Sequence, residues 1–106
     1  MKESELIPEA VGHTVRALCK DYDRRAIEIE RGRLPADILG HYMILNAAID
    51  AGLASCCEEG IRAEMRHDIA ECIGHRFTRL YFLSPDTYKR RKRSSKLAIA
   101  KALKLL

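Results

Sequence analysis

The chain has 106 residues, enough for one small domain with a single hydrophobic core. Its net charge of +4 is unevenly distributed: residues 1–74 hold nine Lys and Arg against fourteen Asp and Glu, a balance of −5, whereas residues 75–106 hold ten against one, a balance of +9. No apolar run approaches the roughly 20 residues of a membrane-spanning helix, and no secretory leader is recognisable. We therefore expect a cytoplasmic protein whose C-terminal third meets a negatively charged partner.

The cysteines and histidines do not indicate an enzyme or a metal centre. Cytoplasmic thiols stay reduced, and three of the four cysteines lie on or near apolar helical positions, so we interpret them as small core residues. Cys72 and His75, with the adjacent pair Cys56 and Cys57, are a weak zinc candidate because a second paired spacing is missing. Gly-rich phosphate loops, HExxH motifs and nucleophile motifs are absent from the sequence. We expect no enzyme, no metal and no cofactor.

Two consecutive segments with apolar residues at every third or fourth position predict a helical hairpin over residues 7–57. The first helix is expected over residues 7–31 with Gly32 as its C-cap, and the second is expected to start at Pro35. Two such stripes pack most simply as antiparallel neighbours. The apolar residues in each helix are spaced four, three and four positions apart, which allows a coiled-coil-like seam between helices of one chain or of two chains. We expect a homodimer. The stripes are Ile7, Val11, Val15, Leu18, Tyr22, Ala26 and Ile29, then Ile38, Tyr42, Leu45, Ile49, Leu53 and Cys56.

Residues 58–106 are predicted to complete the same domain as a variant helix-turn-helix. A break between Ser55 and Gly60 precedes a third helix, which closes at Gly74. The apolar face of this helix consists of Ile61, Met65, Ile69, Cys72 and Ile73. The segment HRFTRLYFL then forms an extended aromatic connector, which we expect to fill the space beside the hairpin while Arg76 and Arg79 stay outside.

The last segment, from Ser84 to Leu106, predicts a basic amphipathic helix. Ser84 suits an N-cap, Pro85 the first helical position, and Asp86 the positive end of the helix dipole. At 100° per residue the apolar side holds Tyr88, Ser95, Ala98, Ile99, Ala102 and Leu106. The opposite side holds Lys89, Arg90, Arg93, Lys96, Lys101 and Lys104. This pattern is typical of a recognition helix that packs by one side and meets a nucleic-acid backbone by the other.

The run from Glu64 to Leu106, with HDIAECIG, then Leu-Ser, then TYKRRKRSSKLAIAKAL, resembles the C-terminal part of sigma-factor region 4 and of small phage transcriptional regulators of the ArpU and RinA type. The stretch YMILNAAIDAGLA also resembles the central helix of such regulators. The resemblance implies sequence-specific binding of double-stranded DNA and transcription regulation by a prophage or mobile-element protein. It departs from the family pattern in the turn, which is several residues longer.

The resemblance places the start of the last helix at the major groove. We therefore expect Asp86, Thr87, Lys89, Arg90 and Arg93 to contact base edges or phosphates. Four further cations are expected to contact phosphates, where a point charge suffices. These are Arg76, Arg79, Lys92 and Lys96.

Alternative partners remain open at this stage. A helical adaptor that contacts an acidic protein, such as an RNA polymerase subunit, would use the same charges. The segment KLAIAKALKLL would also suit a basic helix lying on a membrane surface. We expect no membrane partner, because the apolar side of this helix is the one surface able to dock it on the other helices.

Overall fold

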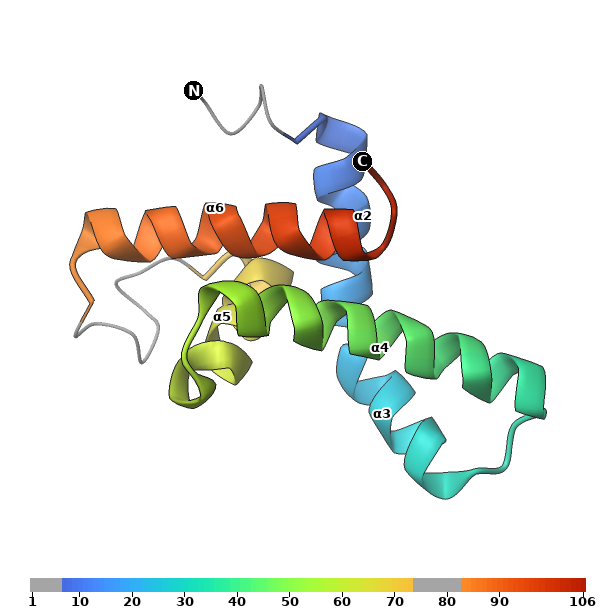
Figure 1. Ribbon diagram of the computed structural model, residues 1–106. Helices are drawn as coiled ribbons and strands as arrows, with labels where there is room; N and C mark the ends of the chain where they lie inside the picture. Colours follow the sequence, from blue (N-terminus) through green and yellow to red (C-terminus); the bar gives the residue numbers. More distant parts are fainter. Residues whose placement is uncertain (1–6, 74–82) are drawn as a thin grey trace.

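The computed structural model describes residues 7–73 and 83–106, and the regular structure of these residues is entirely helical. Its elements are α2 (Glu9–Lys20), α3 (Tyr22–Arg31), α4 (Ala36–Cys56), the short 3₁₀ helix η1 (Glu59–Ile61), α5 (Arg62–Glu71) and α6 (Pro85–Ala102). In Figure 1, α6 lies along the C-terminal half of α4, α2 crosses α6, and α3 extends away from the other helices with the start of α4. The all-α prediction is confirmed.

The predicted long hairpin is present only in its outer half. α3 packs against α4, but α2 turns away from α4 and packs on α5 and α6. The main neighbour of α4 is α6, from the other end of the sequence. The prediction of one continuous helix over residues 7–31 is therefore wrong, and the interruption falls at Asp21.

Asp21 bends the chain so that an arginine can enter the interior. Its backbone leaves the helical region, with φ −94° and ψ 3°, and its carboxylate accepts hydrogen bonds from Arg24 at 2.7 and 2.6 Å. The Arg24 hydrogen bonds hold the pKa of the Asp21 carboxyl below its usual range. Beyond the bend, the buried Arg25 donates to the Leu18 carbonyl and, at 2.8 Å, to the Asn46 amide oxygen. The bend thus gives a buried cation the partners it needs.

The local stop and start signals around α4 act as predicted. Gly32 ends α3 in the left-handed conformation, φ 63°, and its amide donates to the Glu28 carbonyl at 3.0 Å. Pro35 immediately precedes α4, and α4 ends at Cys56, within the predicted break before Gly60. These three predictions are confirmed.

α5 ends earlier than predicted. Its C-cap is Cys72, which takes the left-handed conformation (φ 53°, ψ 44°) that glycine adopts more readily. The Cys72 amide donates to the Asp68 carbonyl at 2.7 Å and closes the last turn. Gly74, which we expected to end the helix, lies outside the described residues.

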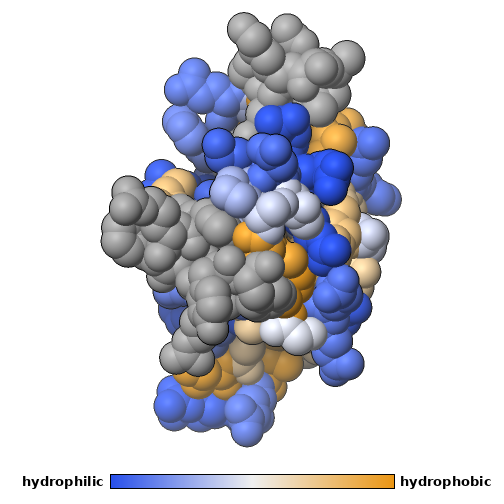
Figure 2. Space-filling model, turned by 90° about the vertical axis from the view of Figure 1, so that its left-hand side faces the viewer, coloured by the Kyte–Doolittle hydropathy of each residue, from blue (hydrophilic) through white to orange (hydrophobic). Residues whose placement is uncertain are grey.

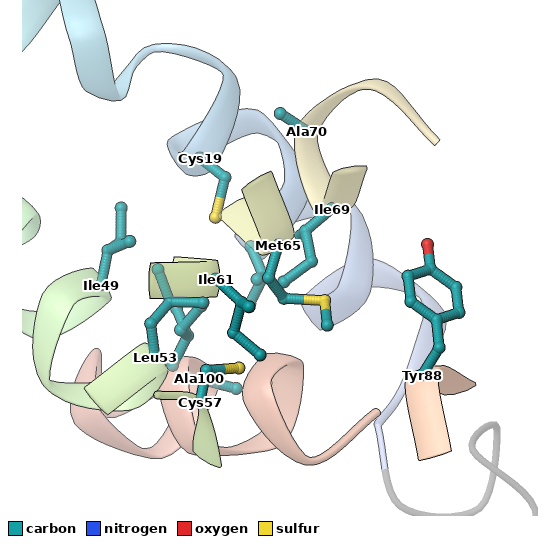
Figure 3. Close-up of a cluster of buried hydrophobic side chains, with 12 residues drawn as sticks. Cys19, Ile49, Leu53, Cys57, Ile61, Met65, Ile69, Ala70, Tyr88 and Ala100 are labelled. Carbon is teal, nitrogen blue, oxygen red and sulfur yellow. The ribbon is translucent and has the colours of Figure 1, made fainter. Parts of the chain in front are cut away.

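The core is a cluster of buried side chains from α2, α4, η1, α5 and α6 (Figure 3). Its members are Val15, Cys19, Ile49, Leu53, Cys57, Ile61, Met65, Ile69, Ala70, Tyr88, Ile99 and Ala100. Burial raises the pKa of the Cys19 thiol to about 11, so this side chain stays neutral among its apolar neighbours. Cys56 packs against the cluster, whereas Cys72 is exposed. The interpretation of the cysteines as core residues therefore holds for three of the four.

α4 and α6 approach most closely where Gly52 faces Ile99. A methyl group built on Gly52 would lie 2.7 Å from the Ile99 backbone nitrogen and 2.8 Å from its Cα. Only glycine allows the two backbones to meet at this distance. The contact fixes where α6 crosses α4, and hence which side of α6 faces outward.

None of the helices formed by residues 7–73 and 83–106 combines the length and the apolar character needed to cross a bilayer.

Candidate nucleic-acid interface

The first turn of α6 has the cap that its sequence predicts. The Ser84 hydroxyl oxygen accepts a hydrogen bond from the Thr87 amide at 3.2 Å, and the same hydroxyl donates to Thr87 Oγ1 at 2.9 Å. Pro85 occupies the first helical position and Asp86 adds a negative charge to the first turn. The start of the basic helix is therefore fixed by residues next to it in the sequence.

The inner side of α6 is seated on α4 and the core. Tyr88, Ser95 and Ile99 are buried, as their spacing predicts. Ser95 Oγ lies 3.3 Å from Cys57 Sγ, so the small polar residue of this side also has a partner. The apolar side of α6 is thus occupied within the fold.

The end of α6 differs from the prediction, which placed Ala102 and Leu106 on the inner side. Both are exposed, because the helix stops at Ala102 and the chain reverses at Lys104, where φ is 59°. The amide of Lys104 donates to the Lys101 carbonyl and the amide of Leu105 to the Ala100 carbonyl, at 3.0 and 2.9 Å. Leu105 then packs against the core from beyond the helix end.

The outer side of α6 carries cations along its first three turns. Lys89 and Arg90 are exposed, and Arg93, one turn further, is partly exposed. Thr87 is partly exposed and Asp86 exposed on the turn before them. Figure 2 looks onto the end of the molecule where α6 begins and shows hydrophilic residues over much of it. We call Lys89, Arg90 and Arg93 the outer cations of α6.

Two other cations of α6 are paired with acids of this chain. Arg91 Nη1 lies 3.2 Å from Glu58 Oε1, and Lys92 Nζ lies 3.1 Å from Asp68 Oδ2. Asp68 is fully buried and the Lys92 side chain is 20% exposed. Lys92, which we expected to contact a phosphate, therefore contacts α5 and is left out of the interface.

A signal for the position of Lys92 was present in the sequence. Lys92 follows Tyr88 by four residues and precedes Ser95 by three, so the helical repeat places it beside the buried side. Asp68, one turn after Glu64 on α5, gave no comparable signal, because its position opposite Lys92 depends on how α5 and α6 pack. The sequence therefore indicated the position of Lys92 but not that of Asp68.

Lys96 lies beyond the outer cations, where α6 passes α2. Its side chain is partly exposed and borders a cleft of about 540 Å³, which α2 and α5 line with Gly12, Arg16 and Ile69 among others. Arg16 Nε, from α2, donates a hydrogen bond to the carbonyl of Ala70 in α5 at 3.1 Å. Lys96 shares the basic side of α6 but has different surroundings from Lys89 and Arg90.

Part of the predicted site lies outside the described residues. Arg76 and Arg79 belong to residues 74–82, as does His75 of the zinc candidate. Within residues 7–73 and 83–106, no group of three or more His, Cys, Asp or Glu side chains is placed to hold a metal ion. Residues 72–84 join α5 to α6, which is far longer than the three- or four-residue turn of a helix-turn-helix.

Comparison of the chain with protein-family models, with curated proteins and with solved structures found no match. We therefore infer function from the geometry and charge of α6.

Proposed function

We propose that the protein binds double-stranded DNA through the outer cations of α6 and regulates transcription from the bound site. This proposal rests on a difference among the cations of α6: some point toward the rest of the fold and are ion-paired, and others point outward. Arg91 and Lys92, which point toward the other helices, are ion-paired with Glu58 and Asp68. No ion pair among the described residues involves the outer cations.

The start of α6 adds features that suit a phosphate backbone or a groove. Arginine can bind guanine or phosphate through two parallel hydrogen bonds, and lysine binds phosphate as a point charge. Thr87, in the first turn, has a methyl and a hydroxyl group that can contact a base edge or a phosphate. Together these residues offer positioning contacts and candidate base contacts on about two turns of helix.

The membrane alternative fits the arrangement of α6 less well. The side that would enter a bilayer carries Tyr88 and Ile99, which are buried against the other helices. Membrane binding would require α6 to leave the core. DNA binding uses the exposed side and leaves the fold intact.

The test compares binding to a labelled random 30-base-pair duplex for the wild-type chain and for the triple variant Lys89→Ala, Arg90→Ala, Arg93→Ala. We expect the triple variant to bind at least about tenfold more weakly at constant salt, because three phosphate or base contacts are removed. Helicity and melting temperature should stay close to wild type, since Lys89 and Arg90 are exposed and the buried Nε of the partly exposed Arg93 makes no hydrogen bond within the described residues that its removal would break.

The matched control removes the same charge elsewhere, with Lys20→Ala, Arg31→Ala and Arg33→Ala, three exposed cations away from α6. This control should bind within about threefold of wild type. Equal losses in both variants would mean that net charge alone attracts DNA, and would overturn the proposed interface. Undiminished binding to an acidic protein after nuclease treatment, without binding to the duplex, would favour the adaptor function instead.

A further inference from the structure

One side of α4 is apolar and exposed over most of the helix. This side, which we call the outer strip of α4, faces away from α3, α6 and the core. It consists of Gly40, Met43, Ile44, Ala47, Ala51 and Ala54. Met43 is 55% exposed and Ile44 68% exposed, the two largest exposures among the large hydrophobic residues that are described.

The rest of α4 shows that this strip is unusual for a surface helix. The opposite side already supplies the core with Ile49 and Leu53, so α4 is apolar on both sides. A helix that is apolar all round is normally covered all round. The charged residues of α4 are Asp37 and Asp50, and neither belongs to the strip; Asp50 turns toward α3 and accepts a hydrogen bond from the Tyr22 hydroxyl at 2.8 Å.

We propose that the outer strip of α4 binds the same strip of a second copy of this chain, antiparallel and about a two-fold axis at Ala47. In this register residue 47 − n lies level with residue 47 + n of the second copy. Met43 then lies level with the small residue Ala51 of the second copy, Gly40 lies level with Ala54, and Ala47 faces its own equivalent. Met43 of one strip fills the space left by the small Ala51 of the other, and Ile44 lies level with Asp50 at the edge of the strip.

The lack of charge and the length of the strip favour this occupant. The strip carries no charge, so it matches a partner surface that is also uncharged, whereas DNA or an acidic protein would bury charge against it. A 21-residue helix is about 32 Å long. One helix pair of this length gives an interface near the small end of specific contacts, so we expect a dimer that forms at micromolar concentrations.

This surface differs from the seam that the sequence predicted. Tyr42, Leu45 and Ile49, from the predicted seam, face the interior of one chain, and Ile49 is fully buried. The dimer therefore uses the opposite side of the same helix. The inference does not depend on DNA binding, and its test uses the full chain alone.

The test is the mass of the full chain by sedimentation equilibrium from about 1 to 500 µM. We expect the mass to rise from the 12.0 kDa monomer toward twice that value. Ala47→Glu should keep the chain monomeric, because two like charges would meet at the axis. The control Ala63→Glu, at an exposed alanine of α5, should dimerise like wild type.

A cross-link tests the register. In a Cys72→Ser background, which removes the exposed native thiol, Ala47→Cys should form a disulfide-linked dimer under mild oxidation, whereas Ala54→Cys should not. Residue 54 of the two copies would be about 21 Å apart along the helix axis. A monomeric mass at all concentrations, or a dimer that survives Ala47→Glu, would overturn the proposal.

Discussion

Lys89 and Lys92 lie on the same helix, three residues apart, and their surroundings give them different roles. Lys89 is exposed, whereas Lys92 Nζ lies 3.1 Å from the buried Asp68 carboxylate and 5.9 Å from the centre of the Tyr88 ring. An exposed lysine contributes little to stability, but a cation opposite a buried carboxylate is costly to remove, since the carboxylate then loses that cation.

We therefore predict opposite effects for two alanine substitutions. Lys92→Ala should lower the free energy of unfolding by about 1 to 3 kcal/mol, because the buried Asp68 loses its cation. Lys89→Ala should change it by less than about 0.5 kcal/mol. Urea unfolding followed by circular dichroism measures both. A Lys92→Ala chain as stable as wild type would show that the pair does not hold α5 to α6.

At the scale of the helices, the close crossing of α4 and α6 positions the outer cations. The crossing depends on Gly52, because an added methyl group would come within 2.8 Å of backbone atoms of Ile99. Backbone atoms cannot move aside as a flexible side chain can. The direction in which Lys89 and Arg90 point therefore depends on a glycine on another helix.

Gly52→Ala is predicted to destabilise the fold although alanine is the better helix former. The steric cost, toward the upper end of about 1 to 3 kcal/mol because the methyl group meets backbone atoms, exceeds the helix-propensity gain of about 1 kcal/mol. Gly12→Ala, in α2, is the matched control: its methyl group would meet only Ile7 Cγ2 at 3.8 Å, an ordinary contact. Thermal melting should show a lower midpoint for Gly52→Ala and a higher one for Gly12→Ala. A higher midpoint for both would mean that α4 and α6 are not closely packed.

Helix starts and stops were predictable because they depend on residues close in sequence. Ser84 caps α6 through Thr87, three residues away, and Gly32 ends α3 through Glu28, four residues away. The bend at Asp21 was not predictable in this way. It is stabilised by the burial of Arg25 against Asn46, which comes from a later helix.

The candidate site was predictable to the extent that the helical repeat of α6 separates its two sides. Tyr88 and Ser95 are buried and Arg90 is exposed, as the repeat requires. The pairing of Lys92 with Asp68 depended on the packing of α5, which no local pattern specifies. Tertiary packing also decided the outcome for the predicted hairpin, because its second helix, α4, packs mainly on α6.

At the scale of the whole molecule, the charges of the two parts of the chain are only partly matched. Residues 1–74 carry −5 and residues 75–106 carry +9, and Arg91 and Lys92 join α6 to the rest of the described chain through ion pairs. Among the described residues, Lys89 and Arg90 stay exposed on the outer side of α6. Such a surface attracts a polyanion over several ångströms and in proportion to its free charge.

The salt dependence of DNA binding tests this account most directly. Neutralising a phosphate releases condensed counterions, so the logarithm of the association constant falls with the logarithm of salt concentration by about 0.9 per phosphate contacted. With the three outer cations in contact, titrations of a labelled duplex between 50 and 300 mM salt should give a slope of about −3. A slope near zero, or no binding at the lowest salt, would contradict the proposal that α6 binds DNA through these residues.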